Sequence, residues 1–233
     1  MVKYARHDLH GLLVVDKPVG VSSMDVVRRV RRAAGNCKTG HAGTLDPLAS
    51  GVLICCLGKA TKAVERLMGL TKVYEATVDL SAFTATDDAE GEREEVAVER
   101  APTDEAVRGV LDGLTGEIEQ VPPAYSAIKV DGKRAYKLAR SGEAVAMKAR
   151  RVRVDEIVVA GYAWPSLRVR VTCGKGTYIR SLARQIGEGL GTGGYLTALR
   201  RTAIGQYTIE QAVGLADLPT PMGMGDLRAV PGD

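Results

Sequence analysis

The sequence lacks the features that would place a chain in a membrane or outside the cell. Its longest uninterrupted apolar run is Val52 to Leu57, which is far too short to cross a bilayer. The first ten residues contain no apolar signal stretch. We therefore expect a protein of the cytoplasm with no membrane partner.

Cysteine and histidine are scarce, which argues against disulfide and zinc sites. The four cysteines, Cys37, Cys55, Cys56 and Cys173, show no Cys-x-x-Cys spacing, so we expect reduced thiols. Cys37 and His41 have a possible ligand spacing, but no second Cys/His pair completes a tetrahedral site. We expect no metal ion in this protein.

Aromatic residues make up only 4% of the 233 residues, but 45% are hydrophobic, which is enough for the core of one large domain. The net charge of +4 is too small to indicate a partner. Its distribution says more: residues 84–120 hold twelve acids and three bases, and residues 129–153 hold nine bases and two acids. A solvated charged face is the simpler explanation of the basic stretch, although a polyanion would also bind there.

The pattern of apolar residues, glycines and prolines predicts a mixed α/β (α+β) fold around a largely antiparallel sheet flanked by helices. Strands outnumber helices, and short turns join most of them. A helix should begin at Ser22 or Ser23 and end at Gly35. The expected strands are 11–16, 52–57, 73–80, 125–130, 152–162 and 167–172; the other expected helices are 59–68, 103–114, 133–140 and 178–190. Residues 38–47 are expected to form a loop, and 87–95 a surface loop.

The loop 40–51 is the most unusual segment, because it places a histidine, an aspartate and three glycines where no periodicity exists. Asp46 precedes Pro47, so an ordinary Asp-Pro turn is its simplest explanation, and His41 could equally cap or pack. Asp46 has no partner carboxylate, which argues against a two-acid glycosidase. The lack of a Ser/His/Asp set or a metal cluster argues against hydrolases of those types.

Two further segments suggest nucleotide chemistry. Arg180 follows Tyr178 at the head of an expected helix, where a guanidinium could pair with a carboxylate and hold it ionised. Tyr74 lies on an expected strand. Each tyrosine alone is more often a core residue. Together with a lone carboxylate, however, they suit an enzyme that takes a base out of its stack and attacks the nucleotide.

Six segments resemble the TruB family of tRNA pseudouridine synthases, of the stand-alone bacterial type. Gly40 to Gly51 resembles the family's aspartate-bearing motif, and Asp16 to Ser23 its opening Lys-Pro motif. The other four are Lys72-Val73-Tyr74, Pro122 to Tyr136 (similar to the thumb insertion that clasps RNA), Gly176 to Arg180, and Leu199-Arg200-Arg201. The resemblance covers about residues 9 to 215 in the expected order.

The resemblance implies the pseudouridine synthase fold and an isomerase without a cofactor, which converts uridine 55 in the T loop of tRNA to pseudouridine. Asp46 would be the catalytic carboxylate, whether it attacks the ribose, adds to the base or assists a glycal route. Tyr74 would stack on the flipped base and help to remove a proton, and Arg180 would pair with Asp46. His41 would fill the gap left by the flipped nucleotide.

The remaining implied roles concern binding. Tyr178 and Leu199 would line the pocket, and Lys17 would support it. The thumb residues expected to bind RNA are Lys129, Lys133, Arg134, Lys137 and Arg140. The expected partner is the T arm of tRNA, bound by a monomer without an obligate protein partner.

The expected organisation is a catalytic domain over 1–217, including a thumb insertion over about 122–150. An irregular tail over 218–233 follows, without a C-terminal RNA-binding domain. Ser81 and Ala85 stand where the family usually has glycine and aspartate.

Two alternatives remain. One is a non-catalytic tRNA-binding or RNA-folding protein on the same fold, and the joint presence of Asp46, Tyr74 and Arg180 argues against it. The other is a synthase guided by a second RNA, which the thumb insertion disfavours.

Overall fold

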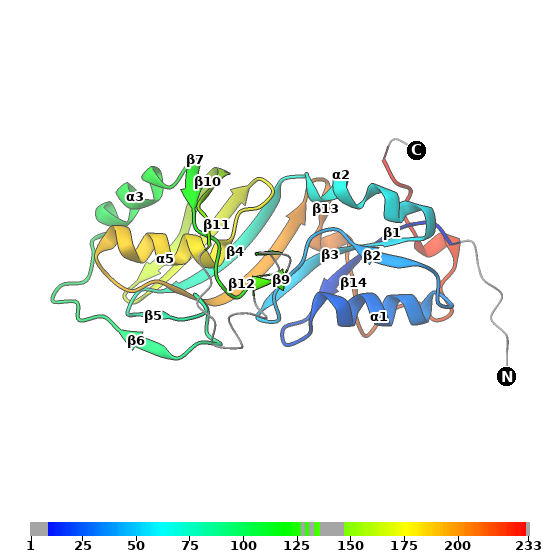
Figure 1. Ribbon diagram of the computed structural model, residues 1–233, viewed down its shortest axis with the longest axis horizontal. Coiled ribbons are helices and arrows are strands. Elements are labelled where there is room, and N and C mark those ends of the chain that lie inside the picture. Colours follow the sequence, from blue (N-terminus) through cyan, green and yellow to red (C-terminus); the bar gives the residue numbers. More distant parts are fainter. Residues whose placement is uncertain (1–8, 127–128, 131–132, 136–146, 232–233) are drawn as a thin grey trace. The chain divides into compact units, whose positions relative to one another are not determined.

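The computed structural model describes residues 9–126, 129–130, 133–135 and 147–231, and the chain divides into two compact units (Figure 1). Unit 1 consists of Met1–Tyr74 and Arg200–Asp233, and unit 2 of Glu75–Leu199. Two strands, β4 (Lys72–Asp79) and β12 (Tyr195–Ile204), begin in one unit and end in the other.

Unit 1 combines short strands with helices on both sides. Its elements are β1 (Gly11–Lys17), α1 (Ser23–Ala33), β2 (Thr39–His41), β3 (Ala49–Leu57), η1 (Gly58–Ala63), α2 (Val64–Met68), β13 (Tyr207–Thr208), η2 (Ile209–Gln211), β14 (Val213–Gly214) and η3 (Met224–Asp226). The strand order is β14-β1-β3, while β2 pairs with β3 and β13 with β12. The β1–β14 pair is parallel, and β1–β3, β2–β3 and β12–β13 are antiparallel.

The two faces of the unit 1 sheet pack against different helices, because side chains alternate along its strands. Leu13 packs with Val26 of α1 on one face, whereas Leu12 packs with Leu67 of α2 on the other. Figure 1 shows α1 and α2 on opposite sides of the sheet. The apolar run 52–57 therefore belongs to a strand that is buried on both faces.

Helix α1 begins and ends where the sequence predicts. Ser22 is its N-cap: its side chain accepts a hydrogen bond from the Asp25 amide, and the Asp25 carboxylate accepts one from the Ser22 amide. At the other end Gly35 and Asn36 adopt φ values of 61° and 66°, the left-handed conformation that ends many helices.

Unit 2 places two helices against an antiparallel sheet. Its elements are β5 (Ala82–Thr84), β6 (Arg93–Glu95), α3 (Asp104–Gly113), β7 (Gly116–Gln120), β8 (Lys129–Val130), β9 (Lys133–Arg134), β10 (Arg150–Ala163), β11 (Ser166–Cys173) and α5 (Ile179–Leu190). The strands β11, β10 and β7 are neighbours in that order, and both pairs are antiparallel.

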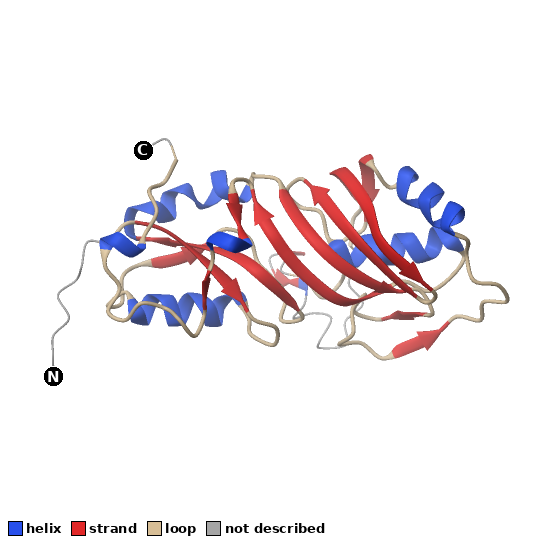
Figure 2. Cartoon of the chain, turned by 180° about the vertical axis from the view of Figure 1, so that it is seen from behind, coloured by secondary structure: helices blue, strands red, loops and turns tan. Residues whose placement is uncertain are grey.

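Side chains also alternate along β11, where Leu167 and Val169 are buried while Arg168 and Arg170 are exposed. The helices α3 and α5 lie on one side of the strands β7, β10 and β11. In Figure 2, which views the chain from behind, these strands lie in front of α5. The predicted mixed α/β fold with a largely antiparallel sheet is confirmed.

Among the described residues of the expected strand 125–130, only Lys129–Val130 form a strand, because Tyr125 and Ser126 lie in a bend. Two segments expected to be a loop and a helix contain strands instead. Residues Thr39–His41 of the expected loop 38–47 form β2, because they pair with the end of β3. Lys133–Arg134, at the start of the expected helix 133–140, form β9 and pair with Lys129–Val130. In both cases the partner strand supplies the hydrogen bonds, and the local sequence pattern does not show that partner. The rest of that expected helix, 136–140, lies outside the described residues.

The segment after Leu218 is irregular apart from η3, but it packs on unit 1. Met222 is 3% exposed and belongs to the same apolar cluster as α1, and its amide donates to the carbonyl of Ala33. Val230 is 6% exposed and belongs to the cluster on the other face of the sheet. The backbones of Leu12 and Arg228 exchange two hydrogen bonds.

Two glycines inside helices of unit 2 predict opposite effects of the same substitution. A Cβ on Gly187 of α5 would lie 2.2 Å from the carbonyl oxygen of Gly193, whereas a Cβ on Gly109 of α3 would meet nothing within 4 Å. We expect Gly187→Ala to lower the free energy of unfolding by about 1–3 kcal/mol through overpacking. Gly109→Ala should raise it by roughly 0.5–1 kcal/mol through helix propensity.

Urea unfolding of the full chain measures both variants under one set of conditions. A Gly187→Ala midpoint equal to or above that of the unaltered chain would contradict the close approach of α5 to Gly193.

Candidate active site

The loop between β2 and β3 carries Asp46 and is tied to the first turn of α1. The Ser23 hydroxyl donates to the Leu45 carbonyl at 2.9 Å, and the Leu45 amide donates to the Ser23 hydroxyl at 2.8 Å. Ser23 is 3% exposed, so water does not compete for this pair. The Gly20 amide donates to the Pro47 carbonyl at 2.8 Å. Asp46 itself is half-buried.

A buried arginine of β12 fixes the other side of the loop. Arg201 is 1% exposed, and its guanidinium donates to the carbonyls of Val52 at 2.8 Å and Gly43 at 3.0 Å. It also reaches the carbonyl of Thr44 at 3.5 Å. A buried charge is tolerated only when hydrogen bonds replace its water. The loop conformation therefore depends on Arg201, a role that the sequence pattern does not indicate.

Lys17, at the end of β1, is fully buried and lies within electrostatic range of Asp46. Its ammonium donates to the carbonyls of Pro18 at 2.9 Å and Val21 at 2.7 Å, which closes the turn between β1 and α1. Burial lowers the pKa of Lys17 to about 8; the Asp46 carboxylate acts to raise it and Arg201 to lower it. A buried cation thus accompanies the candidate catalytic carboxylate.

His41 and Tyr74 also belong to unit 1. His41 ends β2 and is half-buried, and burial, followed by the charge of Arg201, lowers its pKa, so the neutral imidazole is favoured. Tyr74 lies on β4 and is 8% exposed. Asp16 and Arg200 form an ion pair at 2.8 Å in the same unit, and Arg200 donates to the Ser50 hydroxyl at 3.3 Å.

In unit 2, Arg180 is buried near the start of α5 and joins two distant segments. It is 4% exposed; one guanidinium nitrogen donates to the Thr86 carbonyl at 3.0 Å and the other to the Tyr125 carbonyl at 2.9 Å. It also forms an ion pair with Asp88 at 3.4 Å. The predicted pair of Arg180 with Asp46 joins residues of different units and stays a prediction.

Asp87 and Asp88 correct the expectation of a surface loop over 87–95. They are 5% and 3% exposed, because the α5 arginines face them: Arg184 pairs with Asp87 at 2.9 Å, and Arg180 with Asp88. Burial raises the pKa of Asp87 to about 6, against the lowering effect of both arginines. The rest of the segment is mostly exposed, as expected. Asp88 is thus an ionic partner of Arg180 within unit 2, which the charge pattern does not show.

Tyr178 is the N-cap residue of α5 and contacts both ends of the inserted segment. Its amide donates to the Gln120 side chain at 2.7 Å. The Arg150 guanidinium lies over its ring, 5.0 Å from the centroid, and donates to the Gly176 carbonyl at 2.7 Å. Leu199 is 9% exposed. The sequence pattern does not indicate this role of Arg150, because its partners lie 26 and 28 residues further along the chain.

The predicted RNA-binding residues fall on the thumb insertion. Lys129, Lys133 and Arg134 belong to the hairpin β8–β9, whereas Lys137 and Arg140 lie outside the described residues. Within the described ranges, no group of three or more His, Cys, Asp or Glu side chains is arranged to hold a metal ion. Of the helices described, none is long and apolar enough to cross a membrane.

Comparison with known families matches two consecutive parts of the chain. Residues 31–179 match the N-terminal domain of the TruB family pseudouridylate synthases, and residues 180–224 match the tRNA pseudouridylate synthase B C-terminal domain. The first match alone covers more than half of the 233 residues.

Curated proteins agree with these matches. The chain is 53% identical over 220 residues to tRNA pseudouridine synthase B of Thermobifida fusca, covering 89% of this chain and 74% of that protein. It is 49% identical over 217 residues to the protein of the same name from Cupriavidus metallidurans, covering 91% of this chain and 68% of that protein.

Solved structures support the same fold. A chain of a Cbf5-Nop10-Gar1 complex matches with a TM-score of 0.70 and 31% identity, covering 91% of this chain and 54% of that one. A chain of an H/ACA RNP bound to a substrate RNA matches with a TM-score of 0.67 and 30% identity, covering 90% and 52%. This chain thus spans about half the length of those chains. From the family models and the curated relatives together, the chain belongs to the TruB family of pseudouridylate synthases, isomerases that act on tRNA.

Proposed function

We propose that this protein converts uridine 55 in the T loop of tRNA to pseudouridine, with Asp46 as the single catalytic carboxylate. The observation that carries the proposal is the environment of Asp46: a half-buried carboxylate on a loop that buried Arg201 fixes, within electrostatic range of the buried ammonium of Lys17. Such a loop holds the carboxylate in place before the substrate arrives, so little reorganisation is needed during the reaction.

The reaction is an isomerisation and needs no redox partner. The bond between the ribose carbon C1′ and the base nitrogen N1 breaks, the base turns, and its carbon C5 bonds to C1′. The proton on C5 is then lost, and N1 carries a proton in the product, so atoms and charges balance. Direct action of Asp46 on the nucleotide requires the uridine to leave its stack first.

The neighbouring residues supply binding and positioning. Tyr74 stacks on the flipped base and assists removal of the C5 proton, and Tyr178 and Leu199 line the pocket. Arg180 pairs with Asp46 and holds its carboxylate in position. His41 occupies the gap that the nucleotide leaves, and a neutral imidazole can fill that gap by stacking.

RNA binding outside the pocket falls to the thumb insertion. Lys129, Lys133, Arg134, Lys137 and Arg140 contact backbone phosphates of the T arm, as their charge and spacing suit. The protein acts in the cytoplasm as a monomer and needs no cofactor.

The first prediction tests Asp46 directly. Unmodified tRNA transcript incubated with the unaltered chain should gain pseudouridine at position 55, as mapped at nucleotide resolution. Asp46→Asn should give none, because the amide keeps the shape of the side chain but cannot act as a nucleophile or base. Affinity for tRNA should stay within about twofold, since the substitution removes an interaction of the transition state.

Asp112→Asn, on the exposed surface of α3, is the control and should behave like the unaltered chain. Turnover by Asp46→Asn near that of the control would remove Asp46 from the chemistry. Tight binding of tRNA with no product from any form of the chain would instead support a non-catalytic RNA-folding protein.

The second prediction concerns the two hydrogen bonds that the Arg180 guanidinium donates. Its two terminal nitrogens serve carbonyls on separate segments, Thr86 and Tyr125, and a lysine nitrogen cannot reach both. Arg180→Lys should therefore lower the single-turnover rate at saturating RNA by more than about tenfold, a loss of at least about 1.4 kcal/mol of transition-state stabilisation.

Arg168→Lys, on the exposed face of β11, is the matched control and should be neutral. Circular dichroism and urea unfolding of both variants separate loss of the fold from loss of chemistry. A folded Arg180→Lys with an unchanged rate would reduce Arg180 to a structural residue.

The third prediction is a pH dependence from Lys17. Its pKa in the folded chain is about 8, so the ammonium charge beside Asp46 is present below that pH and is lost above it. We expect the single-turnover rate to fall by up to about tenfold per pH unit above pH 8. Lys17→Met should be slow throughout and should lack this decline. A profile of the unaltered chain that stays flat to pH 9.5 would show that the charge of Lys17 does not contribute.

A further inference from the structure

A groove of about 610 Å³ in unit 1 lies apart from every residue assigned above. It is lined by Leu9, His10, Arg31, Gly35, Asn36, Cys37, Lys38, Thr39, Gly58 and Lys59. None of these ten residues is acidic. Grooves of this size accept ligands as large as a nucleotide or a short stretch of polymer backbone.

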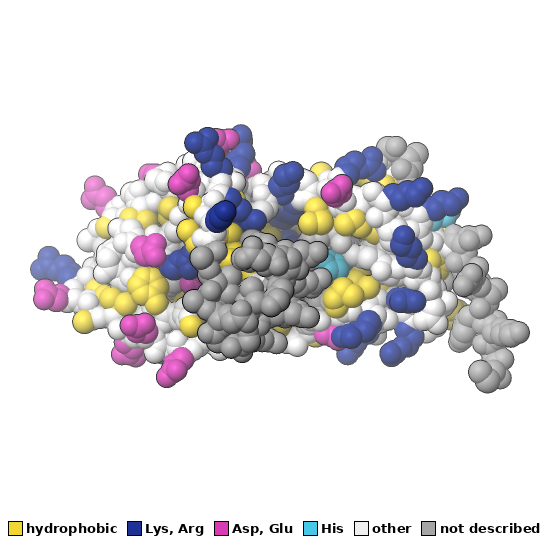
Figure 3. All heavy atoms as spheres, viewed as in Figure 1, with side chains coloured by type: hydrophobic (Ala, Val, Ile, Leu, Met, Phe, Trp, Pro, Cys, Tyr) yellow, Lys and Arg dark blue, Asp and Glu magenta, His cyan; other side chains and the backbone are white. Residues whose placement is uncertain are grey.

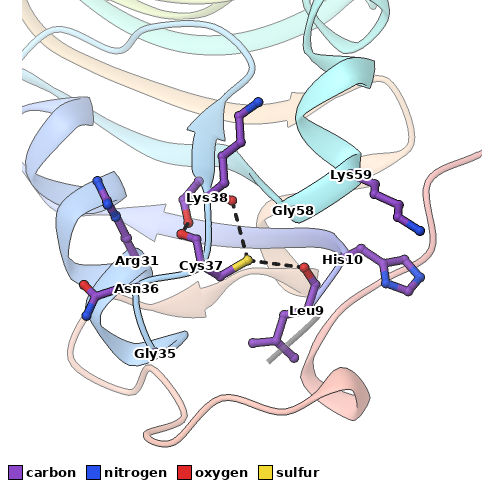
Figure 4. Close-up of a pocket in the computed structure, with 10 residues that line it drawn as sticks. Leu9, His10, Arg31, Gly35, Asn36, Cys37, Lys38, Gly58 and Lys59 are labelled. Carbon is purple, nitrogen blue, oxygen red and sulfur yellow. Dashed lines mark hydrogen bonds between the residues drawn. The ribbon is translucent and has the colours of Figure 1, made fainter. Parts of the chain in front are cut away.

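The positive charges of the groove come from separate segments that the fold brings together. Arg31 lies on α1, Lys38 precedes β2 and Lys59 lies on η1. In Figure 4 Arg31 lies on one side of the groove and His10 and Lys59 on the other, with Cys37 between them. A ligand in the groove would therefore have cationic groups on both sides.

Several of the groove's own hydrogen-bond acceptors are already used. The carbonyls of Leu9 and Lys38 accept from the Cys37 thiol, and the carbonyl of Cys37 accepts from the Thr39 hydroxyl. The Arg31 carbonyl accepts from the Asn36 amide. The side chains of Arg31, Lys38 and Lys59 add donors and positive charge, which favours an anion as the ligand.

In the described part of the chain, no acid forms an ion pair with Arg31, Lys38 or Lys59. The side chains of Arg31, Lys38 and Lys59 have no hydrogen bond or ion pair there. Asp25, the acid of α1, pairs with Arg28. The residues before Leu9 include Lys3, Arg6 and His7 against one aspartate, so the chain's own N-terminal segment does not match the groove in charge.

The groove and the Asp46 loop lie at opposite ends of β1 and β3. Gly11 pairs with Leu57 at the groove end, and Lys17 pairs with Gly51 at the end near Asp46. At about 3.3 Å per residue, the length of β1 separates the two places by roughly 20 Å. An RNA that places its reacting uridine at Asp46 must extend that far to reach the groove.

We propose that this groove binds backbone phosphates of the tRNA at a distance from the reacting uridine. The inference rests on the proposed function, because it takes tRNA as the ligand. Figure 3 shows Lys and Arg side chains gathered on the surface over α1, η1 and α2, so phosphates on either side of the groove would also meet positive charge. The simpler alternative is a solvated basic surface with no preference for the groove.

A pair of triple variants separates the groove from general charge. Arg31→Gln/Lys38→Gln/Lys59→Gln removes three charges from the groove, and Arg29→Gln/Arg32→Gln/Lys62→Gln removes three exposed charges from α1 and η1 outside it. The groove variant should raise the Kd for whole tRNA about tenfold and flatten the salt dependence of log Kd by about two units. The control should change both much less. Equal losses in the two variants would overturn the proposal.

Single-turnover rates at saturating tRNA distinguish the proposal from the proposed function. The groove variant should keep the rate of the unaltered chain, because uniform binding contributes equally to ground and transition states. An unaltered chain that forms no pseudouridine would defeat the proposed function, whereas a groove variant with unchanged Kd and salt slope would defeat the groove alone.

Cys37 provides an independent readout. It is the partly exposed cysteine of the four, while Cys55, Cys56 and Cys173 are buried, and burial raises the pKa of the Cys56 thiol to about 11. Saturating tRNA should slow alkylation of Cys37 by iodoacetamide at least tenfold, and 1 mM uridine monophosphate should not. Unchanged alkylation with tRNA, or equal protection by the nucleotide, would overturn the proposal.

Discussion

A buried guanidinium that donates to backbone carbonyls determines the geometry of the candidate site in unit 1. Arg201 is almost completely buried, and its guanidinium donates hydrogen bonds to the carbonyls of Gly43 and Val52 in place of water. Leaving such a charge without partners would cost far more than an ordinary hydrogen bond contributes, so the loop and the arginine stabilise each other's positions. Asp46 lies within the loop that this exchange fixes.

In unit 2, arginines of helix α5 also donate to backbone carbonyls. Arg180 binds the carbonyls of Thr86 and Tyr125, and Arg184 binds the carbonyl of Val121 at 2.9 Å. Because carbonyls are fixed parts of the backbone, these contacts place whole segments rather than single side chains. The segment that leads into the thumb insertion is therefore attached to the helix that carries Arg180. The proposed binding of RNA to the thumb would therefore act next to a segment that Arg180 holds.

Local patterns predicted those parts of the fold whose causes are local. The start of α1 follows from Ser22 and Asp25, three residues apart, and β11 follows from strict alternation. Strand β2 is different: three residues without a period become a strand because β3 lies beside them. The acidic run 87–95 predicts an exposed loop, but Asp87 is buried because Arg184 pairs with it. The sequence does not show this contact, because the two residues are 97 positions apart.

The candidate site likewise has features that local sequence motifs predict and features that depend on contacts between distant segments. The sequence makes Asp46, Arg180 and Lys17 candidates because they lie in short motifs that resemble a family. The resemblance did not reveal that Arg201 holds the loop or that Arg150 covers the Tyr178 ring, because those roles exist only as contacts between distant segments. A motif names the reacting groups, and the tertiary contacts determine whether they stay in place.

The part of unit 1 that contains Asp46 carries an excess of positive charge. Residues 9–74 hold ten Lys and Arg and four Asp and Glu. Asp16 and Asp25 each pair with an arginine, and Asp46 lies near Lys17, so most of this excess of positive charge stays on the surface. The acidic run 84–120 belongs to unit 2, where its exposed carboxylates repel phosphate. A polyanion is thus attracted to the surface of the unit that holds Asp46 and repelled by the exposed carboxylates of residues 84–120, whatever its base sequence.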